Sequence, residues 1–91
     1  MDREGVEVWL DFHDVENYTI NEDLSVDVSG VVDLSGKSLI VIPIRFGIVG
    51  GDFNCDNNKL LTLEFCPSDV GGSFYCFDNK ITTNLNRTTF Q

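Results

Sequence analysis

The chain has 91 residues, of which 42% are hydrophobic, and a formal net charge of −9. This size and composition favour a single domain with one modest core. They argue against a membrane span, since the longest apolar run, Leu39–Ile44, is short and contains Pro43. The acidity argues against direct binding to nucleic-acid phosphates, and the acidic first residues argue against a secretory signal.

The charge is distributed unevenly along the chain. Residues 1–35 hold ten acids and one base, whereas residues 36–91 hold five of each. An acidic segment attracts a basic surface and speeds the encounter with it. Two alternatives stay open at this point: the acids serve solubility alone, or they mimic the phosphates of duplex DNA.

The first element in the chain is a helix, expected from about residue 4 to residue 16. Asp2 can serve as its N-cap, and the segment contains no proline. We expect Trp9 and Leu10 to cover the open end of the core. The opposite face of the helix is then either covered by the next segment or binds a partner. Apolar residues fall on two faces at helical spacing: Val6, Trp9, Leu10 and His13 on one, and Val8, Phe12 and Val15 on the other.

A hairpin follows the helix. The segments NYTI (Asn17–Ile20) and LSVDV (Leu24–Val28) alternate like strands, and NED (Asn21–Asp23) between them predicts the turn.

The remainder of the chain repeats one phrase at a spacing of 21 residues. A fixed period of this length is typical of a solenoid, in which each coil stacks only on its neighbours. The three copies are VSGVVDLSGKSL (Val28–Leu39), VGGDFNCDNNKL (Val49–Leu60) and VGGSFYCFDNKI (Val70–Ile81).

Each copy predicts a short strand followed by a turn. Alternate side chains of a strand of three to five residues point inward. Asn58 and Asn79 then turn the chain, and their amides can satisfy backbone groups in the bend, whereas Lys37 occupies this position in the first copy. A coil of this length leaves little room for a helix, so we expect extended or single-turn structure on its other side.

These phrases resemble small leucine-rich-repeat proteins found as accessory proteins in tailed bacteriophages and some bacteria. The resemblance is carried by VGGDFNCDNNKLLTLEFCP and VGGSFYCFDNKITTNL and covers roughly residues 6–85. It implies an α+β solenoid in a single domain over residues 1–91. Its parts are a helix and β-hairpin cap at 1–27, about three leucine-rich-repeat coils with a parallel sheet at 28–85, and a tail at 86–91.

The sequence offers no clear catalytic or metal-binding motif. Cys55 and Cys76 share an inward repeat position, about 5 Å apart if the strands stack, and we expect them and Cys66 to be free thiols. A disulfide would be unusual in the cytosol, and a metal site is disfavoured because His13 is the only histidine and no Cys-x-x-Cys motif is present. We therefore expect no enzyme, no cofactor and no metal.

Binding is the remaining class of function, and the resemblance places it on the outward side of the repeat strands. Tyr75 and Phe77 are typical of interface anchors there. The alternative is that the C-terminal tail folds back and covers them through Phe90. The predicted partner-binding residues are Asp33, Asp52, Asn54, Asp56, Ser73, Tyr75 and Phe77.

The last repeat strand is expected to be an edge strand that pairs with a second copy in a homodimer or with the target. The resemblance implies an accessory factor in the host-cell cytoplasm that inhibits or redirects a host protein, such as a defence component. An acidic nucleic-acid mimic and a self-assembling structural piece are the alternatives. Direct nucleic-acid binding and membrane association are not expected.

Overall fold

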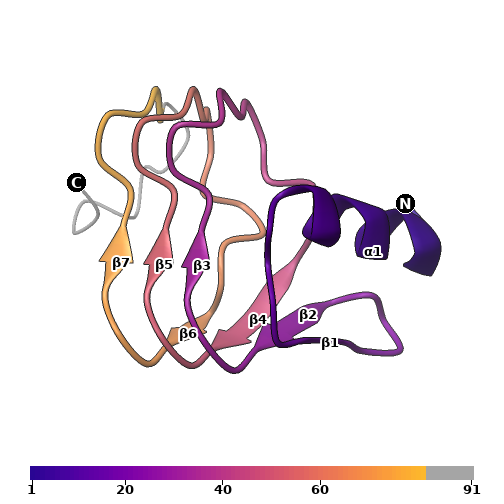
Figure 1. Ribbon diagram of the computed structural model, residues 1–91. Helices are drawn as coiled ribbons and strands as arrows, with labels where there is room; N and C mark the ends of the chain where they lie inside the picture. Colours follow the sequence, from indigo (N-terminus) through magenta and orange to yellow (C-terminus); the bar gives the residue numbers. More distant parts are fainter. Residues whose placement is uncertain (82–91) are drawn as a thin grey trace.

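The computed structural model describes residues 1–81, which form one helix and seven short strands. The chain is a small α+β protein with its strands in parallel and mixed sheets (Figure 1). In chain order the elements are α1 (Arg3–Phe12), β1 (Tyr18–Ile20), β2 (Val26–Val28), β3 (Val32–Asp33), β4 (Phe46–Val49), β5 (Phe53–Asn54), β6 (Asp69–Val70) and β7 (Phe74–Tyr75).

The strands form two sheets that follow the 21-residue spacing of the sequence. One sheet is parallel in the order β3-β5-β7, and the other has the order β1-β2-β4-β6, with β1 antiparallel to β2. The register pairs Val32 with Phe53 and Phe53 with Phe74. Figure 1 shows β3, β5 and β7 side by side, with α1 at the opposite end of the molecule from β7.

The strands of the parallel sheet are two residues long, shorter than the predicted three to five. The backbone bonds between repeats nevertheless continue past them, because Cys55 N donates to Tyr75 O and Asn57 N donates to Phe77 O, both at 2.9 Å. Asn57 has a positive φ of 58°, so the extended backbone that follows β5 ends at this residue. The hydrogen bonds to the next repeat nevertheless continue there.

Helix α1 begins as predicted and ends earlier than predicted. Asp2 is the N-cap, and its side chain accepts a hydrogen bond from Gly5 N at 2.9 Å. The expected end at residue 16 is wrong, since the helix stops at Phe12. Asp14 adopts a positive φ of 59°, and Val15 N donates to Leu10 O at 2.9 Å. This bond closes the helix end and turns Val15 into the core.

The predicted hairpin is present, and it is also part of the second sheet. β1 and β2 pair from Tyr18 with Val28 to Ile20 with Val26. Because β2 also pairs in parallel with β4, the hairpin extends the sheet of the repeats. Its turn includes Leu24, which has a positive φ of 70°.

The core lies between the two sheets and is closed at one end by α1. The rings of Phe46, Phe53 and Phe74 form a row through it, with centroids 5.3 and 5.5 Å apart. Leu10 is fully buried, whereas Trp9 is only half-buried. Leu10 therefore closes this end of the core, and Trp9 contributes less than the sequence indicated.

Helix α1 has ten residues. Across residues 1–81, no helix has both the length and the apolar character that a bilayer crossing requires.

Candidate functional site

The repeats are held together by two asparagine side chains. Asn58 is buried, and its Oδ1 accepts hydrogen bonds from Lys37 N at 3.0 Å and Leu39 N at 2.9 Å. Its Nδ2 donates to Leu34 O at 2.8 Å and to Cys55 O at 3.0 Å. The prediction that this amide satisfies backbone groups of the bend is confirmed, and the amide also joins two repeats.

Asn79 has the same role one repeat later. Its Oδ1 accepts from Leu60 N at 3.0 Å, and its Nδ2 donates to Cys55 O at 2.9 Å and Cys76 O at 3.3 Å. These bonds fix the bend in which the outward residues of the last repeat lie.

Two of the predicted binding residues, Asp52 and Asp56, use their carboxylates to join neighbouring repeats. Asp52 Oδ1 accepts from Ser73 N at 2.8 Å, and Asp56 Oδ1 accepts from Phe77 N at 2.6 Å. Each bond spans 21 residues. The two acids therefore join neighbouring repeats through their side chains, a role that the sequence did not indicate.

Asp33 and Asn54 form local turns. Asp33 Oδ1 accepts from Ser35 Oγ at 2.6 Å and from Ser35 N at 3.0 Å, and these bonds hold the pKa of the Asp33 carboxyl below its usual value. Asn54 Oδ1 accepts from Asp56 N at 2.9 Å. These polar side chains are thus oriented by their own repeats.

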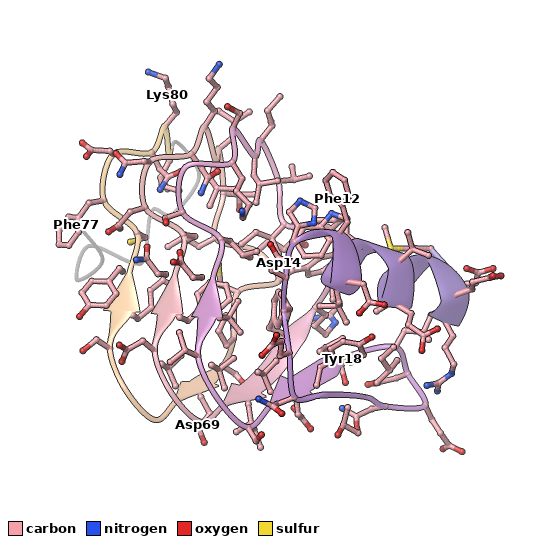
Figure 2. The ribbon with its side chains drawn as sticks, viewed as in Figure 1. Phe12, Asp14, Tyr18, Asp69, Phe77 and Lys80 are labelled. Carbon is pink, nitrogen blue, oxygen red and sulfur yellow. The ribbon has the colours of Figure 1, made fainter. Side chains whose placement is uncertain are left out.

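The structure brings the predicted residues together on one face. Asp33 pairs with Asn54 in the register, and Asn54 pairs with Tyr75. Tyr75 is half-buried, and Phe77 is 52% exposed and points away from the body of the protein in Figure 2. The alternative cover, Phe90, lies outside the described residues. We call the seven predicted residues the outer sheet face.

A second exposed apolar surface lies on α1 and was only partly indicated by the sequence. Val8 is 63% exposed and Phe12 is 80% exposed. Of the two alternatives for this side of the helix, cover by the following hairpin does not apply to these two residues, and binding of a partner stays a prediction. Val15, which was grouped with them, is buried because it follows the helix end.

Aromatic contacts hold the C-terminal end of this surface in place. The rings of Trp9 and His13 stack with centroids 3.9 Å apart, and Phe12 lies edge-on to His13 at 5.1 Å. His13 Nδ1 also donates to Trp9 O at 2.8 Å. Phe12 is therefore exposed but has a defined orientation (Figure 2).

The three cysteines are free thiols, as the sequence predicted. Cys55 is fully buried, and its Sγ donates to Tyr75 O at 3.4 Å. A hydrogen bond with Cys66, together with burial, raises the pKa of the Cys55 thiol well above its usual value, and burial also raises that of Cys76. The contact with Cys66 was not predicted, because Cys66 lies outside the repeated phrase.

Among residues 1–81, no group of three or more histidine, cysteine, aspartate or glutamate side chains is arranged to hold a metal ion.

Comparisons of the chain with known protein families, with curated proteins and with solved structures find no match.

Proposed function

We propose that this chain is a small protein-binding domain of the leucine-rich-repeat type, acting by occupation of a partner protein and not by catalysis. The 21-residue parallel register and the two asparagine side chains that join successive bends support a solenoid of short coils. In such a scaffold the outward side chains of the strands are free to differ from coil to coil and to contact a partner.

The observation that carries the proposal is the exposed ring of Phe77 beside Tyr75, on a face held rigid by carboxylate bonds. Phe77 is 52% exposed, while its backbone N–H is fixed by Asp56. Aromatic side chains on rigid elements lose little conformational entropy on binding and are common interface anchors. The carboxylates of Asp33, Asp52 and Asp56 near them accept hydrogen bonds within the protein, so the aromatic side chains are the proposed anchors.

The resemblance of the repeats to bacteriophage accessory proteins supports a host protein as the partner, in the host-cell cytoplasm, with inhibition or redirection of a defence component as the consequence. A homodimer through β7 stays a prediction, because the residues that follow Ile81 lie outside the described part of the chain.

The nucleic-acid mimic is the second candidate, favoured by the ten acids of residues 1–35. Several of these acids are engaged in local bonds, however. Asp11 accepts from Tyr18 Oη at 2.9 Å, and Asp27 accepts from Ile48 N at 2.8 Å. Binding through the aromatic side chains of Tyr75 and Phe77 requires no phosphate-like array of acids, so we prefer it to mimicry of nucleic acid.

The test is capture of a partner from bacterial lysate by the immobilised protein. Phe77→Lys, alone and with Tyr75→Ser, should lose the partner captured by the wild-type protein. Ile48→Lys is the matched control, because Ile48 is 54% exposed and lies on β4 of the other sheet. Retention of the partner by Phe77→Lys, in protein whose thermal unfolding matches wild type, would contradict the proposal.

A further inference from the structure

Helix α1 is packed on one side and exposed on the other. Val6 and Leu10 are 3% and 0% exposed, whereas Met1, Val8 and Phe12 are 63%, 63% and 80% exposed. Positions 5, 8 and 12 recur at helical spacing and therefore lie along one face of α1. Met1 precedes the N-cap Asp2, and its side chain lies beside Gly5. The exposed residues thus form a continuous apolar row over the length of the helix.

The apolar row borders an open hollow of about 480 Å³. Gly5 lies in its floor, where a Cβ would come within 2.7 Å of Met1 Cγ. The absence of a side chain at this position lets Met1 lie close to the helix. The hollow is lined by Met1, Asp2, Glu4, Gly5, Val8, Trp9 and Phe12.

Acidic side chains run beside the hollow. Glu4 and Glu7 are exposed and stand three residues apart, so that they lie along one flank of the apolar row. Asp11, one turn further on, is exposed but accepts a hydrogen bond from Tyr18 Oη. The single base of α1, Arg3, is directed to the hairpin, where its guanidinium donates to the carbonyls of Ile20 at 3.1 Å and Asn21 at 3.2 Å. The flank is therefore uniformly negative.

We propose that this face of α1 binds a basic amphipathic helix of a partner protein. The partner's apolar side chains would pack on Val8 and Phe12, and its lysines or arginines would lie against the acidic flank. A helix of ten residues is about 15 Å long, which matches a partner segment of about three turns. This surface is additional to the outer sheet face, since Figure 2 shows Phe12 and Phe77 on separate parts of the molecule.

The backbone of α1 explains why the partner segment is helical. The N–H and C=O groups of a helix are bonded internally, so α1 offers no edge to which a strand could add. An amphipathic helix satisfies its own backbone groups and presents one apolar face to such a surface.

The charge of the protein explains why the occupant is not a second copy. Residues 1–35 carry ten acids and one base, and two such segments face to face would repel each other. The protein's own hairpin is also not the occupant, because Tyr18 Oη bonds to Asp11 and Arg3 bonds to the turn. These contacts hold β1 against a different side of the helix.

The test uses the fluorescence of Trp9, which is the only tryptophan of the chain and lines the hollow. The probe is a synthetic amphipathic helix of leucine and lysine, compared with a shuffled peptide of the same composition and with a leucine–glutamate peptide of the same pattern. The amphipathic basic peptide should bind saturably, shift the Trp9 emission, and bind at least about tenfold more tightly than the other two. Equal binding of the shuffled peptide would overturn the proposal.

Matched variants assign the binding to this face, with affinity measured by calorimetry. Val8→Ala and Phe12→Ala should each weaken binding, together by about tenfold or more, whereas Val31→Ala and Phe77→Ala should not, although Val31 is 58% exposed. The pair Glu4→Gln and Glu7→Gln should weaken binding more than the control pair Glu22→Gln and Glu64→Gln.

Unchanged affinity in Phe12→Ala, or a concentration-dependent dimer that Phe12→Ala abolishes, would overturn the proposal. Phe77→Ala is expected to keep the peptide, whereas Phe77→Lys is expected to lose the lysate partner, so failure of this proposal is distinguishable from failure of the proposal for the outer sheet face.

Discussion

The side-chain amide of Asn58 donates a hydrogen bond of 2.8 Å to the carbonyl of Leu34, which lies 24 residues earlier in the chain. Together with the bonds from Lys37 N and Leu39 N, it joins the bend of one repeat to the bend of the repeat before it. A single buried side chain thus satisfies backbone groups from two repeats at once.

We expect Asn58→Ala to lower the free energy of unfolding by about 3 kcal/mol or more, because it leaves several backbone groups without partners inside the protein. Asn79→Ala should cost less, since Asn79 is only half-buried and water can replace part of its bonding. Denaturant unfolding of the two variants measures the difference. An Asn58→Ala protein as stable as wild type would show that the asparagine does not hold the repeats.

Gly30 and Gly51 occupy the same position in the first and second repeats, but they should differ in how well they tolerate a Cβ atom. At Gly51 a Cβ would lie 3.0 Å from the carbonyl oxygen of Gly30, whereas at Gly30 its nearest neighbour is Asn17 Nδ2 at 3.8 Å. We therefore expect Gly51→Ala to destabilise the protein by about 1–3 kcal/mol, as overpacking does, and Gly30→Ala to have little effect. Thermal unfolding provides the comparison, and equal effects at both positions would contradict the close approach of the two repeats at Gly51.

Helix α1 should close the core through Leu10. Leu10→Ala is expected to cost about 3 kcal/mol, the usual range for a fully buried leucine, and Trp9→Ala should cost clearly less because Trp9 is half-buried beside the hollow. If chemical denaturation gave the reverse order, Trp9 would be the closing residue.

The thiols provide a prediction on alkaline pH. The pKa of Cys55 is raised above the usual 9.0 by its bond with Cys66 and by burial, so the folded chain keeps a proton that the unfolded chain loses. The free energy of unfolding should therefore fall as the pH rises above about 9, and the fall should be smaller in Cys55→Ala.

Alkylation of the denatured, unreduced protein should add three groups, since all three cysteines are free. One addition would reveal a disulfide.

The periodicity of the sequence predicted the parallel register, because the same residue types recur at equivalent positions of the repeats. Phe53 and Cys55 are buried as their alternation indicates, and Asn58 bonds as its place in the bend requires. In the second sheet, the hairpin strands β1 and β2 were predicted, whereas β4 and β6 were foreseen only as extended or single-turn structure. The valines that open the three repeats lie in its strands β2, β4 and β6: Val28, Val49 and Val70. The same 21-residue repeat therefore also indicates the pairing of these strands.

Other features could not be predicted from local sequence. The end of α1 depends on the left-handed conformation of Asp14 and on the hydrogen bond from Val15 N to Leu10 O, which form only in the folded protein. The role of Asp52 was not predictable either, since an outward carboxylate is indistinguishable from a binding group until the backbone N–H of Ser73 is placed opposite it. The hollow on α1 likewise depends on which side of the helix the hairpin covers.

The salt dependence of partner binding tests the central claim most directly. The partner captured by the wild-type protein is titrated at rising salt concentration, with the Tyr75→Ser and Phe77→Lys double variant in parallel. An interface anchored by Tyr75 and Phe77 should lose little affinity with added salt and should be lost in the double variant. An affinity that falls by orders of magnitude with salt, and that the double variant keeps, would contradict the account and favour a mimic of nucleic acid.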